Sequence, residues 1–173
     1  MSALADELAA HIRGGDDRSS DIWRALADRE LFARTVAALA VPFRGERYTK
    51  VVGLEARGFV LGGAMAAHTD AGFVAVRKED GWLPDEVVER EAEEDWKARR
   101  HVLRLQRDVL SPDDRVVLVD DWFETGAQAL AARALIEESG ATLVGMSIVV
   151  DDLSDEARAG LGRLHALLRA DAL

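Results

Sequence analysis

Two adjacent aspartates, Asp120 and Asp121, directly follow an uninterrupted apolar run, and Thr125-Gly126 comes four residues after them. The run, residues 116–119 (VVLV), is short, uncharged and rich in β-branched residues, which is typical of a strand buried on both faces of a parallel sheet. The sequence that follows is helical in composition. The acidic pair and the Thr-Gly pair therefore lie between the carboxyl end of a strand and the amino end of a helix, where open α/β sheets bind ligands and where helix N–H groups favour anions.

A second strand end carries a similar arrangement. Residues 51–63 read VVGLEARGFVLGG, which predicts a buried strand ending in Glu55, a tight turn over Ala56-Arg57-Gly58 and then a helix. Arg57 offers a planar fork for a phosphate, and Gly58 allows the backbone to come close to a ligand. Glu55 and Arg57 could instead simply pair with each other. Two such strand ends in one sheet favour a ligand site.

The charge balance limits the partners. The chain has 22 basic and 32 acidic residues, a net charge of −10, which argues against a surface for nucleic-acid polymers or anionic membranes. A small anionic ligand needs only a local basic cluster. Candidates for such a cluster are Arg77, Lys78, Lys97, Arg99, Arg100 and Arg104. Solvated surface ion pairs are the alternative interpretation of these residues.

Composition predicts one globular domain. With 173 residues, of which 49% are hydrophobic and 31% charged, residues 1–173 suit a single domain with a sizeable core. Cysteine is absent, which excludes disulfides and zinc–thiolate sites. No apolar run approaches a membrane span, and the first residues lack a basic leader with a hydrophobic stretch. We therefore expect a soluble, cytoplasmic protein.

Hydrophobic periodicity predicts alternating helices and strands after two leading helices. Helices are expected over 2–12, 20–40, 58–69, 126–139 and 154–169, and strands over 50–55, 72–77, 101–106, 115–120 and 142–150. This order predicts an α/β fold with a parallel sheet and right-handed crossovers. Segment 79–99 is too long for an ordinary connection, and composition alone favours an acidic surface helix over a mobile lid there.

At this point the motifs resemble a known family. The stretch VVLVDDWFETGAQA (116–129) is similar to the phosphoribosyl-pyrophosphate (PRPP) motif of type I phosphoribosyltransferases. The ordered set GLEARGFVLG, FVAVRKEDGWLP, LRLQRDVLSPDDRVVLVDD and GATLVGMSIVVDDL resembles adenine phosphoribosyltransferases, over roughly residues 28–153. The resemblance implies the type I fold: a central parallel sheet flanked by helices, a small hood from residues 1–45 and a mobile lid within 79–106. It also implies a homodimer, and it replaces the surface helix over 79–99 with the lid.

The resemblance further implies transfer of ribose 5-phosphate from PRPP to a purine-type base, with Mg²⁺ and release of pyrophosphate. Asp120, Asp121 and Arg57 are then the catalytic residues, the two aspartates accepting hydrogen bonds from the ribose hydroxyls. Loop 124–128 wraps the 5′-phosphate, and Mg²⁺ binds through the substrate rather than in a protein metal site. The pyrophosphate is held by Arg57, Arg77 and Lys78. The expected substrate-binding residues are Glu55, Ala56, Arg57, Gly58, Arg77, Lys78, Asp120, Asp121, Glu124, Thr125, Gly126, Ala127 and Gln128.

Two of the chain's departures from the family bear directly on its function. Its phosphate loop, Glu124 to Gln128, reads ETGAQ where the family usually has ATGGT, so a carboxylate stands beside the expected phosphate. The family's lid also carries a glutamate that assists the base, and here only Glu93, Glu94 and the dipeptide Asp95-Trp96 are approximate matches. These differences leave open a second function, a non-catalytic protein that senses PRPP or a nucleotide on the same fold.

Other classes fit less well. A response-regulator receiver also has paired acids after a strand, but only 52 residues follow Asp121. Dinucleotide and P-loop glycine motifs are absent. Trp82, Trp96 and Trp122 could stack on a base or simply pack. The four histidines, His11, His68, His101 and His165, lack ligand spacing, so none is assigned to a metal or to base catalysis.

Overall fold

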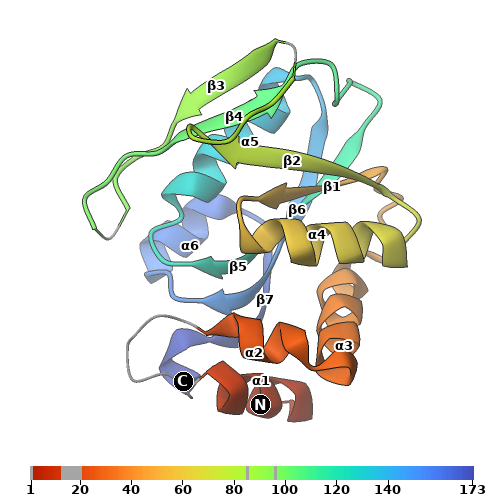
Figure 1. Cartoon of the computed structure of the whole chain (residues 1–173), viewed down its shortest axis with the longest axis vertical. Coiled ribbons are helices and arrows are strands. Elements are labelled where there is room, and N and C mark those ends of the chain that lie inside the picture. The colour runs from red at the N-terminus through yellow and green to blue at the C-terminus, as the bar shows by residue number, and fades with distance from the viewer. Residues whose placement is uncertain (1, 13–20, 85, 96) are drawn as a thin grey trace.

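The computed structural model describes residues 2–12, 21–84, 86–95 and 97–173. Its centre is a seven-stranded sheet in the order β3-β4-β2-β1-β5-β6-β7 (Figure 1). The strands are β1 (Lys50–Leu54), β2 (Gly72–Lys78), β3 (Val87–Glu91), β4 (Val102–Gln106), β5 (Arg115–Phe123), β6 (Thr142–Asp151) and β7 (Leu164–Arg169). The α-helices are α1 (Ala3–Ile12), α2 (Ile22–Ala27), α3 (Arg29–Ala40), α4 (Arg57–His68), α5 (Ala127–Glu138) and α6 (Asp155–Leu161). Short 3₁₀ helices η1 (Val41–Phe43) and η2 (Ala170–Ala172) complete the elements.

The five strands β2, β1, β5, β6 and β7 are parallel, as the alternating pattern predicts. Strands β1 and β5 are neighbours at the centre, with Val51 opposite Val117 and Gly53 opposite Val119. Their carboxyl ends, which carry the two sets of candidate site residues, therefore lie side by side.

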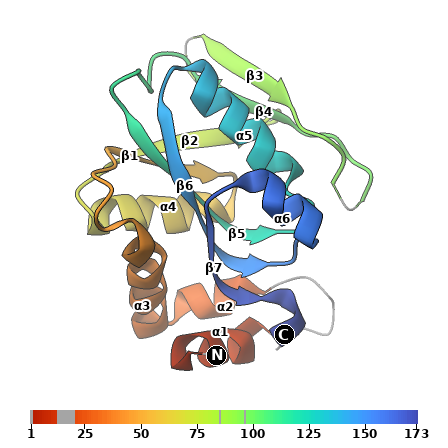
Figure 2. The same cartoon turned by 180° about the vertical axis from the view of Figure 1, so that it is seen from behind.

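Helices cover both faces of the sheet (Figure 2). On one face, α1 to α4 pack on a core that includes Leu39, Leu61, Val117 and Val149. On the other face, α5, α6 and the β3–β4 hairpin enclose a core that includes Leu118. No helix of the described residues is both long and apolar enough to cross a membrane.

The sequence predicts one helix over 20–40, but the structure has two helices among the described residues of this range. The first, α2, ends at Ala27, and α3 begins at Arg29. Asp28 separates them: its backbone is extended, and its carboxylate accepts hydrogen bonds from the N–H groups of Glu30 (2.9 Å) and Leu31 (2.8 Å). This is an N-cap, so the polar residue inside the apolar pattern starts a new helix instead of continuing the first one.

The surface helix that composition favours for 79–99 is wrong. Residues 87–91 form β3, which pairs antiparallel with β4, and β4 in turn pairs antiparallel with β2. The alternation in Val87–Glu91 is weak because this edge strand is largely exposed. The sheet is therefore mixed, with a protruding β3–β4 hairpin at its edge (Figure 1).

The helix expected over 154–169 is also wrong in its second half. Ser154 caps α6 by accepting a hydrogen bond from the Ala157 N–H at 3.2 Å, but the helix ends at Leu161. Gly162 adopts φ 76°, a left-handed value that favours glycine, and the chain then continues as β7. The signal for this turn was Gly162, which the helical composition on either side obscured.

Candidate active site

One cavity of about 410 Å³ lies where the carboxyl ends of β1 and β5 meet the first residues of α4 and α5. Its lining includes residues from both predicted strand ends and from the β3–β4 hairpin. Of the expected substrate-binding residues, Glu55, Ala56, Arg57, Lys78, Asp120, Asp121 and Glu124 to Gln128 line it. The topology thus brings together residues that are up to 73 positions apart, from Glu55 to Gln128.

Arg57 and Asp121 form the ion pair at the base of this cavity. The Arg57 Nε atom lies 2.8 Å from the Asp121 Oδ2 atom, and the Asp121 side chain is only 5% exposed. Arg57 remains 34% exposed, so one edge of its guanidinium is held while the side chain still lines the cavity. The pairing of Glu55 with Arg57 that the sequence left open is not what the structure shows.

Asp120 is held differently from its neighbour. Its Oδ1 atom accepts a hydrogen bond from the Asp121 N–H at 2.9 Å. Burial raises the pKa of Asp120 well above its ordinary value, and the adjacent charge of Asp121 raises it further. The ionised carboxylate is therefore costly in the free protein and gains most from a ligand that donates hydrogen bonds or brings positive charge.

Glu55 pairs with Arg77. The Arg77 Nη2 atom donates to Glu55 Oε1 at 2.9 Å, and the Lys78 N–H donates to Glu55 Oε2 at 2.9 Å. The hydrogen bond with Arg77 lowers the pKa of Glu55, which keeps this carboxylate ionised. Arg77 also donates to the Trp82 carbonyl at 2.9 Å. Arg77 does not line the cavity but fixes the chain on either side of Lys78, which does.

Gly58 is buried rather than exposed to the cavity. A Cβ atom at this position would lie 2.9 Å from Asp120 Oδ1 and 2.9 Å from the Val119 carbonyl oxygen. Glycine is therefore required because α4 approaches the end of β5 closely, which differs from the close approach to a ligand expected from the sequence. The consequence for the site is indirect: Gly58 lets Arg57 reach Asp121.

Loop 124–128 forms the start of α5. Gly126 adopts φ 77° as the N-cap residue, and the Thr125 Oγ1 atom accepts a hydrogen bond from the Ala127 N–H at 3.2 Å. The first N–H groups of α5 have no acceptor within the helix, which is the arrangement that binds phosphates at helix amino ends. Glu124 lies at this end, and burial raises its pKa, as do the charges of Asp152 and Asp95.

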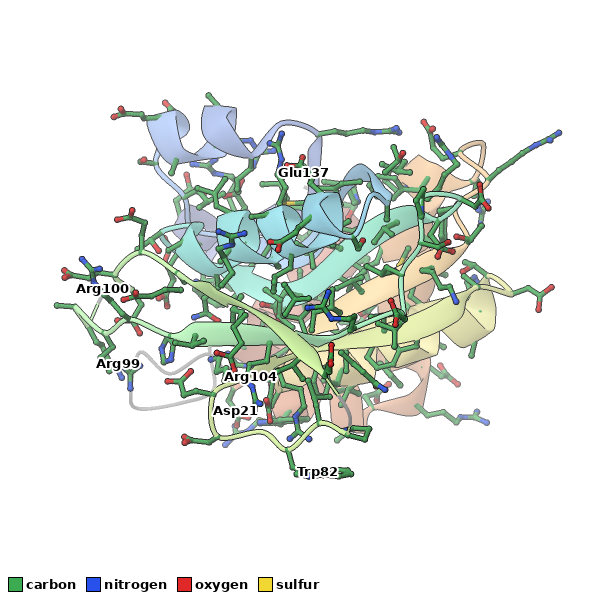
Figure 3. All side chains as sticks on the ribbon, turned by 90° about the horizontal axis from the view of Figure 1, so that it is seen from above. Asp21, Trp82, Arg99, Arg100, Arg104 and Glu137 are labelled. Atoms are coloured by element: carbon green, nitrogen blue, oxygen red, sulfur yellow. The ribbon has the colours of Figure 1, made fainter. Side chains whose placement is uncertain are left out.

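The tip of the β3–β4 hairpin reaches the same cavity through Asp95, Arg99 and His101. Asp95 Oδ1 accepts the N–H groups of Lys97 (2.8 Å) and Arg99 (3.0 Å), and Asp95 Oδ2 accepts from the Arg99 guanidinium (3.0 Å). Burial opposes the ionisation of Asp95, but these hydrogen bonds lower its pKa to about 2. His101 stands between Asp95 (3.3 Å) and Glu79 (3.6 Å). Figure 3 shows Arg99 and Arg100 at the hairpin tip.

These hairpin residues were only partly anticipated. Arg99 belongs to the predicted basic cluster, and Asp95 is one of the approximate matches to the lid acid, whereas Glu93 and Glu94 are exposed and do not line the cavity. His101 was assigned no role in the sequence, and nothing in its spacing indicates the cavity. It reaches the site because it directly precedes β4, which pairs antiparallel with β2, so this end of the hairpin lies beyond the carboxyl end of β2.

The tryptophans that the structure describes lie in different environments. Trp122 lines the cavity and packs on the core beneath α1 to α4. Trp82 is 76% exposed, does not line the cavity and projects outward from the molecule (Figure 3). Trp96 lies outside the described residues. Trp23, on α2, also lines the cavity, and it was assigned no role from the sequence.

Comparisons with known proteins agree with this geometry. The family model for the phosphoribosyl transferase domain matches residues 23–159. This chain belongs to the phosphoribosyltransferase family. An adenine phosphoribosyltransferase of Rhizobium johnstonii is 37% identical over 157 residues, covering 87% of this chain and 86% of the relative.

Solved structures support the same family. An adenine phosphoribosyltransferase from Rhodothermus marinus superposes with a TM-score of 0.85 and 32% identity, covering 96% of this chain and 98% of that one. The enzyme from Saccharomyces cerevisiae gives a TM-score of 0.83 and 27% identity, over 96% and 99% of the two chains. The predictions of a type I phosphoribosyltransferase fold and of a pentosyltransferase are confirmed.

Proposed function

We propose that this phosphoribosyltransferase binds PRPP in the 410 Å³ cavity and transfers its ribose 5-phosphate to a purine-type base. The observation that carries the proposal is the meeting of three groups in one cavity: the acidic pair Asp120-Asp121, the phosphate loop 124–128 and Arg57. The two carboxylates accept hydrogen bonds from the ribose hydroxyls. The loop holds the 5′-phosphate, and Arg57 with Lys78 faces the pyrophosphate as it leaves.

We further propose that Mg²⁺ binds through the substrate. No group of three or more His, Cys, Asp or Glu side chains in the described ranges is arranged to hold a metal ion. Mg²⁺ prefers oxygen ligands and usually takes several of them from substrate phosphates. Asp120 and Asp121 lie where such an ion would also reduce the repulsion that raises the Asp120 pKa. When bound, Mg²⁺ would neutralise negative charge on the pyrophosphate.

Adenine is the base that the relatives favour. The yeast structure holds adenine together with an imino-altritol bisphosphate, and the Rhizobium and Rhodothermus proteins are adenine phosphoribosyltransferases by name. These relatives favour a transferase over the non-catalytic sensor that the altered phosphate loop leaves open. Trp122 lines the cavity directly after the acidic pair, so we place the base near its ring.

Pyrophosphate release tests the proposal. Purified protein is mixed with PRPP, Mg²⁺ and one base at a time from a panel that includes adenine, hypoxanthine, guanine and uracil. We expect release with adenine and little with the pyrimidine. Tight PRPP binding without release on any base would make the protein a sensor, and absence of PRPP binding would refute both functions.

Removing the charge of Glu124 should tighten PRPP binding. A carboxylate beside a phosphate dianion costs on the order of 1 kcal/mol at intermediate dielectric, so Glu124→Ala should lower the Kd about fivefold. Because the pKa of Glu124 is raised, the benefit should be largest at pH above that pKa, where wild-type Glu124 is ionised, and should vanish at lower pH. Calorimetric titration at several pH values measures both effects.

Glu124→Gln is the matched control, because it keeps the size of the side chain and removes only its charge. It should reproduce the tightening. An unchanged, low affinity in both variants would mean that the loop favours a ligand without this phosphate. Weaker binding would instead make Glu124 a ligand contact, through Mg²⁺ for example.

The β3–β4 hairpin is proposed as the mobile lid of the site. A substrate surrounded by protein must enter through a segment that opens, and the hairpin tip lines the cavity while lying at the sheet edge. Hydrogen exchange in its described residues, within 79–106, should slow by up to about 100-fold at PRPP concentrations 100 times the Kd. Amides of β6 serve as the internal reference. Strong and equal protection with and without PRPP would exclude a lid.

Residues 1–45 are proposed as the hood of the fold. The surface formed by α4 and β2 is proposed as a homodimer interface. The described helices α1 to α3 lie together at one end of the molecule (Figures 1 and 2). Val60 of α4 and Phe73 of β2 are exposed apolar side chains, and Phe73 also packs edge-on against Phe59 of α4. Exposed apolar surface of this kind favours association. Sedimentation of the Phe73→Lys variant should show monomers if this surface forms the dimer.

A cytoplasmic location is also proposed, and it rests on composition.

A further inference from the structure

A second cavity, of about 290 Å³, lies at the opposite end of α4 from the active site. Arg57, the first residue of α4, lines the active site, whereas His68, the last, lines the second cavity. With a rise of 1.5 Å per residue, these ends are about 16 Å apart. The loop between α3 and β1 forms the other wall, beside the last turn of α4 (Figure 1).

The polar lining of this cavity consists of hydrogen-bond donors. Arg44, Arg47, Tyr48 and His68 face it, and among the described residues that line it none is Asp or Glu. Every arginine of the described ranges forms an ion pair with a carboxylate except Arg44 and Arg47. In a chain of net charge −10, two arginines without a carboxylate at one cavity are a local positive site.

The acid between the two arginines is bound elsewhere. Glu46 pairs with Arg163 and, at 3.3 Å, with Arg115, and its carbonyl accepts a hydrogen bond from Arg115 Nε at 3.0 Å. The hydrogen bond with Arg163 lowers the pKa of Glu46, so this carboxylate stays ionised in that network. These contacts anchor the loop and leave Arg44 and Arg47 facing the cavity. The site is therefore preorganised.

The backbone at Arg47 also has a conformational cost. Arg47 has φ 47°, a left-handed value that glycine or asparagine adopts more readily. Because this conformation is costly for a residue with a Cβ atom, its occurrence at an arginine favours a functional role for the Arg47 side chain. At the nearby carboxyl end of α4, the Met65 carbonyl accepts both the Thr69 N–H (3.0 Å) and the Thr69 hydroxyl (2.8 Å), so this carbonyl is already satisfied within the protein.

We propose that this cavity is a second binding site, separate from the active site, for a small phosphate-bearing anion. Two guanidinium groups can hold phosphate oxygens in bidentate geometry, and the Tyr48 hydroxyl and His68 ring add donors. The volume corresponds to roughly ten water molecules, which suits inorganic phosphate, pyrophosphate or the phosphate end of a nucleotide. The proposal does not depend on the reaction at the other end of α4.

Tyr48 makes the test specific, because it is the only tyrosine in the sequence. Protein grown with 3-fluorotyrosine gives one ¹⁹F resonance, which reports on this cavity. We expect saturable shifts with inorganic pyrophosphate and with phosphate, against sodium chloride at equal ionic strength. Titration with adenosine monophosphate distinguishes the sources: a tighter response to the nucleotide assigns the site to a nucleotide phosphate, and a tighter response to pyrophosphate assigns it to inorganic anions.

Two variants in the second cavity and one control variant in the active site test whether the anion binds in the second cavity. Arg44→Gln and Arg47→Gly should each weaken the pyrophosphate response at least about tenfold, as loss of a charge-assisted hydrogen bond implies. Arg47→Gly should also raise the Tm, since it relieves the left-handed backbone. Arg57→Gln, at the active site, should leave the ¹⁹F titration unchanged. Absence of a saturable shift, or equal responses in the wild type and both cavity variants, would overturn the proposal.

Discussion

Asp120→Asn should weaken PRPP binding by about 10- to 100-fold while the protein becomes as stable as the wild type or more so. The loss of affinity follows from the proposed function, in which Asp120 is a charged acceptor for the ribose hydroxyls. The stability follows from the raised pKa of Asp120, because a partly buried ionised carboxylate beside Asp121 costs free energy in the folded state. Asparagine keeps the Oδ1 acceptor for the Asp121 N–H.

The pH dependence fixes the sign of the stability change. A carboxyl group whose pKa is raised on folding destabilises the folded state at pH values above its unfolded pKa, near 3.9. The gain from Asp120→Asn should therefore be full above the raised folded pKa and should disappear as the pH falls below about 4. Thermal unfolding from pH 3 to pH 8 and calorimetric titration with PRPP at neutral pH measure the two effects.

Asp121→Asn is the matched comparison, and its stability should change in the opposite direction. Asp121 is buried and holds Arg57 at 2.8 Å, so removing its charge leaves the guanidinium without this partner. We expect a lower Tm together with weaker PRPP binding. If Asp120→Asn instead lowered the Tm and left the PRPP affinity unchanged, the acidic pair would have a structural role and the site assignment would fail.

The edge of the sheet that carries the candidate site could be predicted from the sequence, because the signal for a strand end is local. Asp120, Asp121 and Glu55 follow short apolar runs, and the carboxyl ends of parallel neighbours must meet at one edge. The pairings within the site could not be predicted. Whether Arg57 contacts Glu55, two residues away, or Asp121, 64 residues away, depends on the close approach of α4 to β5 that Gly58 permits.

The errors in the fold have a related cause. Segments 79–99 and 162–169 are rich in Glu, Ala, Leu and Arg, whose intrinsic preference is helical, yet they contain edge strands. Strand β7 forms because it pairs with β6, with Ser147 opposite His165 and Asp151 opposite Arg169. Such long-range pairing overrides local propensity, and it leaves little periodic signal at the edge of a sheet.

Asp151→Asn should be among the most destabilising single changes in the protein. Asp151 is fully buried at the end of β6, where it pairs with Arg158 of α6 and with Arg169 of β7 at 3.2 Å. Removing one partner from a buried ion pair costs about 3–5 kcal/mol, and the lower value applies here because both arginines partly reach solvent. For a domain of this size, about 3 kcal/mol lowers the Tm by roughly 6–12 °C, which calorimetry measures.

Asp171→Asn is the control, because Asp171 and Asp151 both line a cavity of about 340 Å³ near the end of the chain, but Asp171 is exposed. It should change the free energy of unfolding by less than about 0.5 kcal/mol. Equal effects of the two variants would show that the buried charge of Asp151 has no special role.

The effect of Asp151→Asn should also reach the active site through packing. The Asp151 carboxylate accepts the Leu153 N–H at 3.1 Å, and Leu153 with Leu161 lies directly beneath Gly126, where a Cβ atom would meet them at 3.3 and 3.4 Å. Loss of this support should loosen the phosphate loop, so the still-folded variant should bind PRPP more weakly than wild type at 25 °C. Unchanged PRPP affinity in a destabilised variant would show instead that the loop is held by α5 alone.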